Sequence, residues 1–467
     1  MGPIETAAKS VLCKPYFKKT EARADLASLS HVFSQLNLTA ILGGNNAVER
    51  FSYFTAEPVE VFEFKISQDN PFEKLQSVLN KYKLDENCHI DSPDGIFTGG
   101  WIGYFSYELG RYIEKIPETT TDDINMPLIR LCFYDKVIAY DHKNKNFRLI
   151  ALELETDTET IEQKIDWLRK LLDSAGEINV PTPAKADLDN IDLGQFNCNL
   201  DKDYYFNSIE KIKHYIFDGD VYQINFSQRF DCDFAADAIN LFHWQNHYNP
   251  SGFAAYIDTG DFKIVSASPE MFVTIGDGII STKPIKGTRR RTNDKQTDEK
   301  NYKELINSPK EQAELNMIVD LERNDLARIC KAGTRKVTQR RTIETYPTVF
   351  HAVATVSGEL KKQITFCDIL KAIFPGGSIT GAPKVAAMEI IDETEPTARG
   401  VYTGSIGLLG LNGDACLNIA IRTIIISGGK AYAQTGGGIV ADSNAKDEWN
   451  ETITKARALL AGIKAVK

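Results

Sequence analysis

A polar stretch near the middle of the chain limits how the sequence can fold. Residues 176–195 (GEINVPTPAKADLDNIDLGQ) contain two prolines, are largely polar and acidic, and show neither a helical nor a strand period. A chain of 467 residues is too long for one simple core and long enough for two or three lobes. The sequence therefore predicts an N-terminal region over residues 1–180 and a C-terminal region over residues 196–467.

Composition and charge narrow the classes of function. The chain is 42% hydrophobic and 25% charged, with a formal net charge of −10. This balance argues against a general nucleic-acid binder and against an anionic membrane surface, but not against a local basic pocket for a small anion. No apolar run approaches the length of a membrane span, and Met1–Glu5 does not resemble the start of a signal peptide. The eight cysteines show no CxxC spacing, so we expect reduced, mostly buried thiols in a cytoplasmic protein.

Local patterns predict a mixture of helices and strands. In the N-terminal half we expect strands at 51–56, 59–66 and 99–107, a hairpin of 128–140 with 147–154, and helices at 70–84 and 159–175. In the C-terminal half we expect a helix at 201–217 and strands at 221–230, 253–257, 264–267, 271–275 and 278–281.

A short loop follows the last of these strands and holds a constrained lysine. In residues 282–288 (TKPIKGT), Pro284 fixes the backbone and Gly287 allows a close turn, so Lys286 between them has little freedom. A lysine that is held and desolvated loses proton affinity and can act as a nucleophile. A solvated surface lysine beside a proline and a glycine would have the same local sequence, so the surrounding residues must decide.

A helix predicted over residues 308–329 carries an acidic residue on its apolar face. It begins with the capping-box pattern at Ser308, with proline at the first helical position. Glu314 shares the face of Met317 and Leu321, which is unusual for an unpaired glutamate. The alternative is that Glu314 lies at the edge of the apolar stripe and reaches water.

The last predicted helix, over residues 443–462, places Glu448, Glu451 and Lys455 on one face. Together with Glu314, these carboxylates suit Mg²⁺, which takes few protein oxygens and shares its remaining positions with water and an anionic substrate. An ordinary solvated face with a Glu451–Lys455 pair is the alternative interpretation.

Two glycine-rich segments can present backbone N–H groups to an anion. Residues 375–384 (PGGSITGAPK) lead into a helix that starts near Pro383, and residues 434–438 (QTGGG) form a turn after a strand. Neither segment fits GxGxxG or GxxxxGK[ST], so a carboxylate is favoured over a nucleotide phosphate. Arg422, on a strand predicted over 415–427, can add a bidentate clamp.

These motifs resemble those of the chorismate-utilising enzymes, in particular the component I group of aminodeoxychorismate synthases. The resemblance spans roughly residues 200–460, with a looser likeness before it, and rests on motifs that occur in the family's order. They are GDVYQIN at 219–225, SPE at 268–270, PIKGT at 284–288, Glu314 with MIVDLERND at 317–325, GGSITGAPK at 376–384, GSIG at 404–407, IRT at 421–423, GGGIVADS at 436–443, and Glu451 with KARA at 455–458.

The resemblance implies an α+β fold, a single large α/β/β/α sandwich with the active site in the C-terminal half. It also implies a Mg²⁺ cofactor held by Glu314 and Glu451, with Glu448 near, and a carboxylate of chorismate bound to that ion. It further implies a set of residues that bind the anionic groups of the substrate. They are Thr380, Tyr402, Arg422, Gly436, Gly437, Gly438, Lys455 and His351, although a structural histidine is nearly as good an interpretation of the last.

Lys286 decides the branch of the family, because anthranilate synthases typically carry alanine there and aminodeoxychorismate synthases carry the lysine. The resemblance implies that neutral Lys286 attacks C2 of chorismate while Glu270 protonates the leaving C4 hydroxyl. Ammonia then adds at C4 and expels the lysine, giving 4-amino-4-deoxychorismate for para-aminobenzoate and folate synthesis. One departure from the family is Arg289-Arg290-Arg291 after the loop, where a proline is more usual.

The ammonia has to come from elsewhere, because no cysteine here has the glycine neighbours of a glutaminase nucleophile. The resemblance therefore implies a partner glutamine amidotransferase subunit, component II. Some relatives hold tryptophan in an N-terminal pocket, and Ser52 lies on a strand that can correspond to it. Three alternatives stay open: anthranilate synthase component I, an isochorismate or salicylate synthase that uses water, and a non-catalytic binding subunit. The presence of Glu270, Glu314, Glu448 and Glu451 counts against the last.

Overall fold

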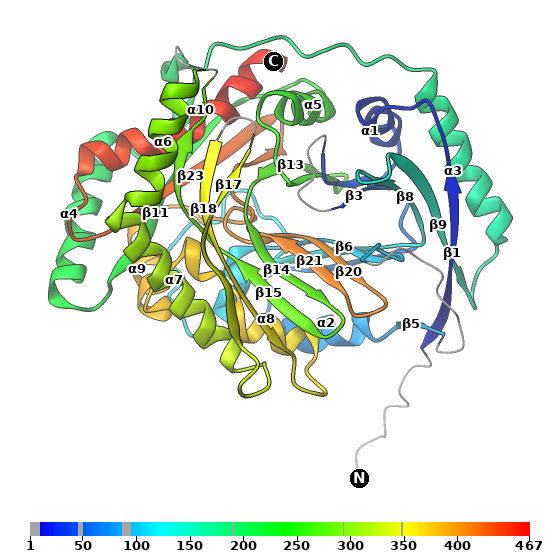
Figure 1. Ribbon diagram of the computed structural model, residues 1–467, viewed down its shortest axis with the longest axis horizontal. Helices are drawn as coiled ribbons and strands as arrows, with labels where there is room; N and C mark the ends of the chain where they lie inside the picture. The colour runs from blue at the N-terminus through cyan, green and yellow to red at the C-terminus, as the bar shows by residue number, and fades with distance from the viewer. Residues whose placement is uncertain (1–9, 45–49, 86–94, 189–190, 293, 347–348) are drawn as a thin grey trace.

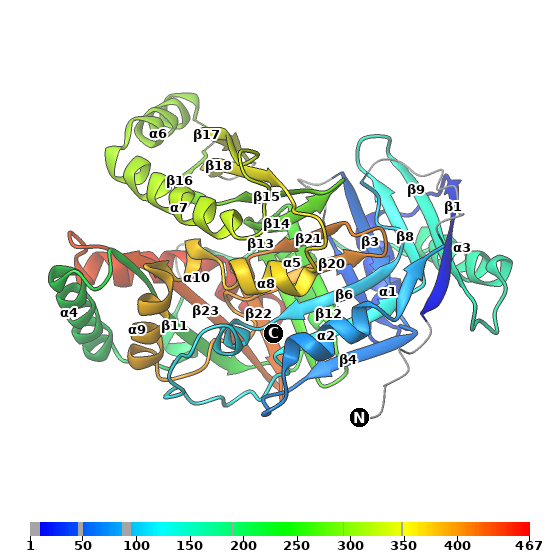
Figure 2. The same ribbon diagram turned by 90° about the horizontal axis from the view of Figure 1, so that it is seen from below.

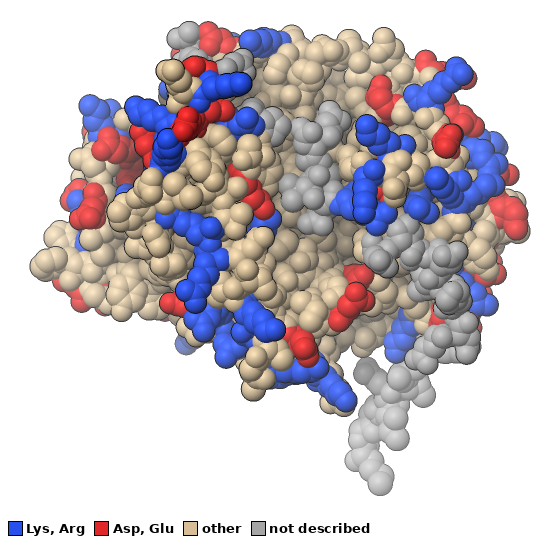
Figure 3. All heavy atoms as spheres, viewed as in Figure 1, with Lys and Arg blue, Asp and Glu red and all other residues tan. Residues whose placement is uncertain are grey.

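Two large β-sheets form the centre of the computed structural model, which describes residues 10–44, 50–85, 95–188, 191–292, 294–346 and 349–467. Met1–Glu5, from which we expect no signal peptide, and Cys88 lie outside these ranges. In the described residues no helix is both long and apolar enough to span a bilayer. Lys and Arg side chains lie among Asp and Glu over the face drawn in Figure 3.

The first sheet has 13 strands. In spatial order they are β10 (Asn197–Cys198), β11 (Gln223–Asp233), β23 (Lys430–Ile439), β22 (Thr423–Ser427), β13 (Phe262–Ser268), β12 (Phe253–Asp258), β2 (Ala40–Leu42), β3 (Phe51–Thr55), β8 (Lys136–Asp141), β9 (Asn146–Leu154), β1 (Val11–Thr20) and β5 (Tyr82–Leu84), with β19 (Gly381–Ala382) paired to β11.

The second sheet has 10 strands. In spatial order they are β16 (Ile285–Arg290), β18 (Val349–Glu359), β15 (Ile279–Lys283), β14 (Met271–Gly276), β21 (Ala415–Asn418), β20 (Ser405–Gly410), β6 (Gly100–Phe105), β7 (Ile129–Tyr134) and β4 (Glu60–Phe64), with β17 (Lys336–Thr345) paired to β18.

Helices cover the outer faces of both sheets (Figures 1 and 2). They are α1 (Leu26–Ser34), α2 (Pro71–Leu79), α3 (Ile161–Gly176), α4 (Lys202–Asp218), α5 (Ala238–Tyr248), α6 (Lys295–Asn307), α7 (Pro309–Ala327), α8 (Phe366–Ile373), α9 (Lys384–Thr394) and α10 (Ala445–Val466), with short 3₁₀ turns η1 (Tyr107–Tyr112), η2 (Leu193–Gln195) and η3 (Gly377–Ile379).

Three groups of buried apolar residues give the order of the layers. One joins α1, α3, α5 and α10 to the first sheet, and another joins α2, α7 and α8 to the second sheet. A third group is built from strands of both sheets, with Tyr104, Val137 and Ile264 among its members, and fills the space between them. The arrangement is therefore helix, sheet, sheet, helix, and the predicted α/β/β/α sandwich is confirmed.

Both sheets contain strands from each side of the linker at 176–195. In the first sheet β2 pairs with β12, and in the second sheet β6 pairs with β20. The predicted division into residues 1–180 and 196–467 stays a prediction. The two segments are joined in space, because strands from both pair within each sheet.

Three local predictions were wrong, each at a point where the chain changes partner. The helix expected to reach residue 84 ends at Leu79, because the next residues pair in parallel with β1 as β5. The strand expected over 128–140 is two strands, β7 in the second sheet and β8 in the first, separated by the buried Asp135. The strand expected over 415–427 likewise divides into β21 and β22, which belong to different sheets.

The seam between β6 and β20 depends on two facing glycines, Gly103 and Gly407. A Cβ on Gly103 would lie 1.9 Å from the carbonyl oxygen of Arg130, and one on Gly407 would lie 2.0 Å from that of Cys416. Neither neighbour can move easily, because both oxygens belong to the backbone of adjacent strands. The seam therefore requires residues without a side chain.

We expect Gly103→Ala to lower the free energy of unfolding by about 1–3 kcal/mol, because the added methyl forces the backbones of β6 and β7 apart. Urea denaturation followed by tryptophan fluorescence would measure the change. Gly176→Ala is the matched control, since its Cβ would lie 3.8 Å from the backbone nitrogen of Ala24, which is an ordinary contact. Equal stability of the two variants would contradict this account of the seam.

Candidate active site

The lysine loop lies at the edge of the second sheet, where β15 leads into β16. Lys286 is the second residue of β16, and its Nζ donates to the backbone oxygen of Ser378, 3.3 Å away. Gly287 has a φ of +94°, and a Cβ there would lie 3.0 Å from the Glu311 carboxyl and 2.9 Å from Leu305. Helices α6 and α7 therefore pack closely over the loop and hold the lysine in place.

Glu270 approaches the same loop from between β13 and β14. Its side chain is buried, and Oε1 accepts from the backbone N–H of Ile285 at 3.4 Å. Burial raises the pKa of Glu270, although a hydrogen bond from Ser378 and the charge of Lys286 oppose the rise. Burial lowers the pKa of Lys286, although Glu314 and Glu270 oppose the fall. Both pKa shifts are in the directions that favour a protonated acid and a neutral amine, and Ser378 contacts both groups.

The predicted acidic face of α10 points at the glycines of β23. A Cβ on Gly437 would lie 3.3 Å from Glu448 Oε2 and 3.6 Å from Glu451 Oε1, so both carboxylates converge on this glycine. Ser443 Oγ donates to Glu448 at 2.6 Å. Lys455 Nζ lies 2.7 Å from Glu451 Oε1 and donates to the carbonyl oxygen of Gly436 at 2.8 Å.

Protonation differs between the two glutamates of α10. Burial raises the pKa of Glu448, with a smaller contribution from the charge of Glu451. Burial also acts to raise the pKa of Glu451, but the charge and hydrogen bond of Lys455 outweigh it and hold the pKa below its usual value. Glu451 is therefore the more firmly ionised of the two.

Glu314 faces this group from α7. Burial raises its pKa, and the charge of Lys286 is the strongest opposing influence. The N-cap at Ser308 is formed, since its side chain accepts from the Glu311 N–H, but the Glu311 carboxylate pairs with Arg289 at 2.6 Å instead of completing the predicted capping box.

The described residues contain no group of three or more His, Cys, Asp or Glu side chains close enough together to be a metal site by themselves. Glu448 and Glu451 do converge beside Gly437, where the absence of a side chain leaves room. Carboxylate oxygens are the donors that Mg²⁺ uses, and it needs only one or two of them when substrate and water complete its coordination. The donor set therefore fits Mg²⁺.

The three glycines at 436–438 are not in a turn, as the sequence predicted, but inside β23. They pair with Ser227, Phe226 and Asn225 of β11. On the edge of β23 that faces away from β11, pairing with β22 ends at Ala433. In the described part of the sheet, residues 436–438 therefore have no strand neighbour on that edge. Backbone groups on that edge can then face the α10 carboxylates and a ligand.

Two further predicted residues line the same region. Thr380 is fully buried, with its Oγ1 donating to the Gly376 carbonyl at 2.9 Å. Tyr402 is also buried, and its hydroxyl would lie 3.0 Å from a Cβ on Gly436. Burial raises the pKa of Tyr402, so its hydroxyl stays protonated and can donate.

Arg422 and His351 form a third part of the site. Arg422 adopts a left-handed backbone (φ +49°) between β21 and β22, where the chain crosses from one sheet to the other. Its Nη1 donates to Asn249 at 3.4 Å, and among the described residues it forms no ion pair. His351 is buried on β18, and its Nδ1 shares a hydrogen bond of 2.8 Å with Thr288 Oγ1, two residues after Lys286.

All of the predicted residues thus lie around the region between the edges of the two sheets. Figure 2 shows β16, β17, β18, α6 and α7 on one side of this region and β11, β23, α4, α9 and α10 on the other. The charges of Lys455 and Glu451, on α10, both act on the pKa of Lys286, which lies on β16 across this region. The role of each residue remains a prediction, but their placement is that of one site.

A cavity of about 470 Å³ lies elsewhere, between strands of the N- and C-terminal halves, and none of the predicted site residues lines it. Phe51, Tyr53, Phe97 and Asn418 are among its walls. Ser52, where the resemblance suggested a tryptophan pocket, is buried and hydrogen-bonded to His142 Nε2 at 2.8 Å. The tryptophan pocket stays a prediction.

A family model described as chorismate binding enzyme matches residues 39–461. The chain belongs to this family. It is 40% identical to aminodeoxychorismate synthase component 1 of Bacillus subtilis (strain 168) over 80% of this chain and 79% of that protein. It is 37% identical to anthranilate synthase component 1 of Acinetobacter calcoaceticus over 84% of this chain and 80% of that protein.

Among solved structures, anthranilate synthase component I from Streptococcus pneumoniae TIGR4 superposes on the chorismate binding enzyme fold of this chain with a TM-score of 0.76. The two chains are 31% identical, and the match covers 89% of this chain and 93% of the other. The predicted family is therefore confirmed.

Sequence reasoning missed three residues of the site. Gln223 on β11 is buried, and its Oε1 has no hydrogen-bond partner among the described residues, while its Nε2 would lie 2.3 Å from a Cβ on Gly438. Ser378 contacts both Lys286 and Glu270. Lys310 is exposed on the first turn of α7, and its charge acts on Glu314, Glu448 and Glu451. Gln223 belongs to the motif GDVYQIN, but only the pairing of β11 with β23 reveals its contact.

We expect His351 to steepen the dependence of stability on pH. Burial, with Arg422 nearby, lowers its pKa from 6.5 to about 3, so the folded protein excludes a proton that the unfolded chain binds below pH 6.5. The free energy of unfolding then falls as the pH drops from 6.5 toward 3. His351→Asn should make this fall shallower by up to about 1.4 kcal/mol per pH unit.

Urea denaturation at several pH values between 7 and 5 would measure the slope. His214→Asn, at an exposed position on α4, is the matched control. A slope that is the same in wild type and His351→Asn would show that His351 is not held neutral in the folded state.

Proposed function

We propose that this chain is the component I of an aminodeoxychorismate synthase and converts chorismate and ammonia to 4-amino-4-deoxychorismate. The single observation that carries the proposal is that the half-buried Lys286 and the buried Glu270 both contact Ser378. Chorismate has to exchange its C4 hydroxyl for an amine, and a lysine nucleophile beside a protonated acid suits that exchange. A relative named aminodeoxychorismate synthase component 1, 40% identical, supports the assignment.

In the first step neutral Lys286 forms a bond from Nζ to C2 of the ring, the ring double bond shifts, and the C4–oxygen bond breaks. Glu270 gives its proton to the departing hydroxyl, which leaves as water. Ser378 holds both groups in position through its contacts with Lys286 and Glu270. The proton lost from the amine on attack passes to solvent.

In the second step ammonia forms a bond to C4, the double bond returns, and the bond from C2 to Lys286 breaks as the lysine nitrogen takes back a proton from solvent. Glu270, now a carboxylate, takes a proton from the incoming amine and is restored as an acid. The balance is chorismate and ammonia in, and 4-amino-4-deoxychorismate and water out. Lys286 ends the cycle as it began.

Anionic groups of the substrate would be held by the walls described above. Arg422 offers a guanidinium that, within the described part of the chain, no carboxylate occupies, and Lys455 and Tyr402 lie at the glycines of β23. Mg²⁺ would be held by Glu314 and Glu451, with Glu448 near. When bound, it neutralises a carboxylate of the substrate that would otherwise face three glutamates.

We further propose that ammonia is supplied by a separate glutamine amidotransferase subunit. The name component 1, carried by the relatives, implies a second component for those proteins. Anthranilate synthesis is the second candidate function, since a relative 37% identical carries that name, and its products would be anthranilate and pyruvate.

We expect the purified chain, given chorismate, Mg²⁺ and ammonium, to form 4-amino-4-deoxychorismate without anthranilate or pyruvate. Lys286→Ala should lower the rate by at least about 1,000-fold, because the nucleophile is removed. Chromatography with mass detection would measure the products.

Lys283→Ala is the matched control for that experiment. Lys283 lies in the same loop but pairs with Glu344, away from Ser378. Anthranilate from the wild type would favour the second candidate, and an unchanged rate in Lys286→Ala would exclude the covalent step.

We also expect Glu314→Gln and Glu451→Gln each to raise the Mg²⁺ concentration for half-maximal activity by at least about tenfold, because each loses a charged oxygen ligand. Titration calorimetry of Mg²⁺ in the presence of chorismate would measure the same shift without turnover. Glu299→Gln, on the exposed face of α6, is the control. Mg²⁺ requirements equal to those of the wild type would contradict the ligand assignment.

A further inference from the structure

A buried arginine lies behind the walls of the site, and the proposed chemistry does not use it. Arg399 is 3% exposed and lies between α9 and β20. Its Nε donates to Glu395 Oε2 at 2.8 Å and its Nη2 donates to Glu395 Oε1 at 2.6 Å, which is a bidentate pair. Glu395 is itself 3% exposed. The pair is therefore shielded from water.

The remaining donors of Arg399 bind two backbone carbonyls and one side-chain hydroxyl in the segments around the proposed chorismate site. Nη2 also donates to the carbonyl of Asn225 at 2.6 Å, and Nη1 donates to the carbonyl of Ile379 at 3.1 Å and to Thr403 Oγ1 at 3.3 Å. A guanidinium has five N–H donors, so every donor of Arg399 is used.

Each of these contacts is next to a residue predicted to bind substrate. Ile379 precedes Thr380, and Asn225 pairs with Gly438 across the sheet. The guanidinium also lies 5.9 Å from the centre of the Tyr402 ring. One side chain thus joins three separate parts of the wall.

Glu395 extends the network beneath the glycines. Its Oε1 accepts from the backbone N–H of Ser227 at 2.9 Å and from Ser227 Oγ at 2.7 Å. Ser227 pairs with Gly436, whose carbonyl receives Lys455. The Arg399–Glu395 pair therefore fixes β11 at both ends of the glycine stretch of β23.

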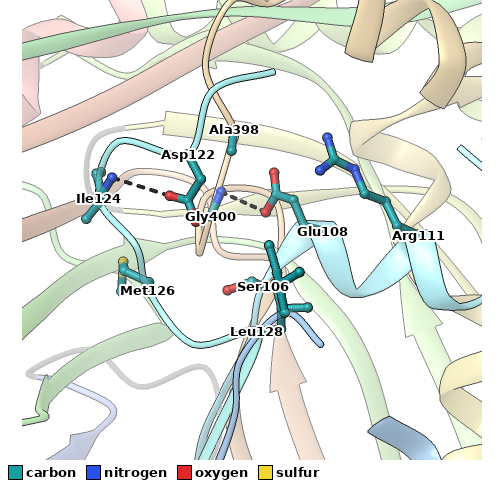
Figure 4. Close-up of a pocket in the computed structure, with 10 residues that line it drawn as sticks. Ser106, Glu108, Arg111, Asp122, Ile124, Met126, Leu128, Ala398 and Gly400 are labelled. Atoms are coloured by element: carbon teal, nitrogen blue, oxygen red, sulfur yellow. Dashed lines mark hydrogen bonds between the residues drawn. The ribbon is translucent and has the colours of Figure 1, made fainter. Parts of the chain in front are cut away.

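The N-terminal half anchors the same arginine through its backbone. Glu108, on η1, accepts from the N–H of Arg399 at 2.7 Å and from that of Gly400 at 3.0 Å. Figure 4 shows Glu108 directed at Gly400, beside a cavity of about 20 Å³ that Asp122 also lines. The segment that carries Arg399 is therefore fixed by both halves of the chain.

We propose that Arg399 is a positioning residue for the chorismate-binding wall, acting through the carbonyls of Ile379 and Asn225 on Thr380 and Gly438. Lysine cannot replace it, because an ammonium has three donors on a single atom and cannot reach five acceptors set in a plane. The inference rests on the proposed function only in taking chorismate as the substrate.

Arg399→Lys and Arg111→Lys form a matched pair for the test. Arg111 is a partly buried arginine that pairs with Asp392 of α9 at 2.5 Å and with Thr120 Oγ1 at 2.7 Å, but not with the substrate wall. Steady-state rates with ammonium and calorimetric binding of chorismate would be measured for both. For Arg399→Lys we expect KM and the dissociation constant for chorismate to rise at least about tenfold, with kcat changing less than KM. For Arg111→Lys we expect both constants to stay within about twofold of wild type, whatever the loss of thermal stability.

A second measurement covers the case in which Arg399→Lys does not fold. Arg399→Ala leaves a cavity of guanidinium shape, and we expect methylguanidinium at millimolar concentration to restore chorismate affinity to this variant and not to Arg111→Ala. Glu395→Gln, which keeps the shape and removes the charge, should also weaken chorismate binding.

Equal changes in KM for Arg399→Lys and Arg111→Lys would overturn the proposal, as would absence of rescue in a folded Arg399→Ala. The wild-type product distinguishes this outcome from failure of the proposed function. If the wild type made anthranilate, the reaction would be reassigned, while the difference between the two arginine variants in chorismate affinity would still test Arg399.

Discussion

The pairing of N-terminal strands with C-terminal strands in both sheets is the constraint on which the site depends. Because β2 joins β12 and β6 joins β20, neither sheet is complete without both halves of the chain. The site strands β11 and β23 lie near one end of the first sheet, and β16 and β18 lie at one end of the second. A rigid frame of this kind holds side chains from the two sheets at fixed separation, which is what a reaction between a buried nucleophile and a bound substrate requires.

The charges of the site are the basis for proposing a cation in it. Glu270, Glu314, Glu448 and Glu451 surround a region that also has to accept an anion. Burial keeps protons on Glu270, Glu314 and Glu448 to a higher pH than usual, whereas Lys455 keeps Glu451 ionised. An anionic substrate among these carboxyls needs a stronger counter-charge than the exposed Lys310 provides, and this is why we propose a divalent cation there.

Much of this site could be predicted from sequence because it is encoded in local patterns. The proline and glycine around Lys286 and the spacing of Glu448, Glu451 and Lys455 follow directly from backbone preferences and helical periodicity. The errors came where tertiary pairing overrides local pattern. Asp135 and Arg422 each mark a point where one apolar run supplies a strand to both sheets, and no periodicity in the run records the change of sheet.

Contacts between distant segments could not be predicted from the sequence, because they depend on which strands pair. Gln223 and Gly438 meet only because β11 pairs with β23, which are separated by most of the C-terminal half. The five bonds of Arg399 involve segments on both sides of it along the chain. A lone arginine in EPTARG has no sequence signature for such a role.

Overall similarity cannot separate the two candidate activities, because relatives with either name are 40% and 37% identical to this chain. An anthranilate synthase component I shares the fold of this chain, so we infer that the difference in product comes from a few groups that touch the ring. Lys286 is one that can form and break a covalent bond, and a short alkyl side chain at that position cannot. Burial lowers the pKa of its amine, and Ser378 binds the amine at 3.3 Å. The charges of Glu314, Glu270 and Glu451 act on this half-buried lysine, and packing alone does not require that arrangement, so we propose the covalent role for it.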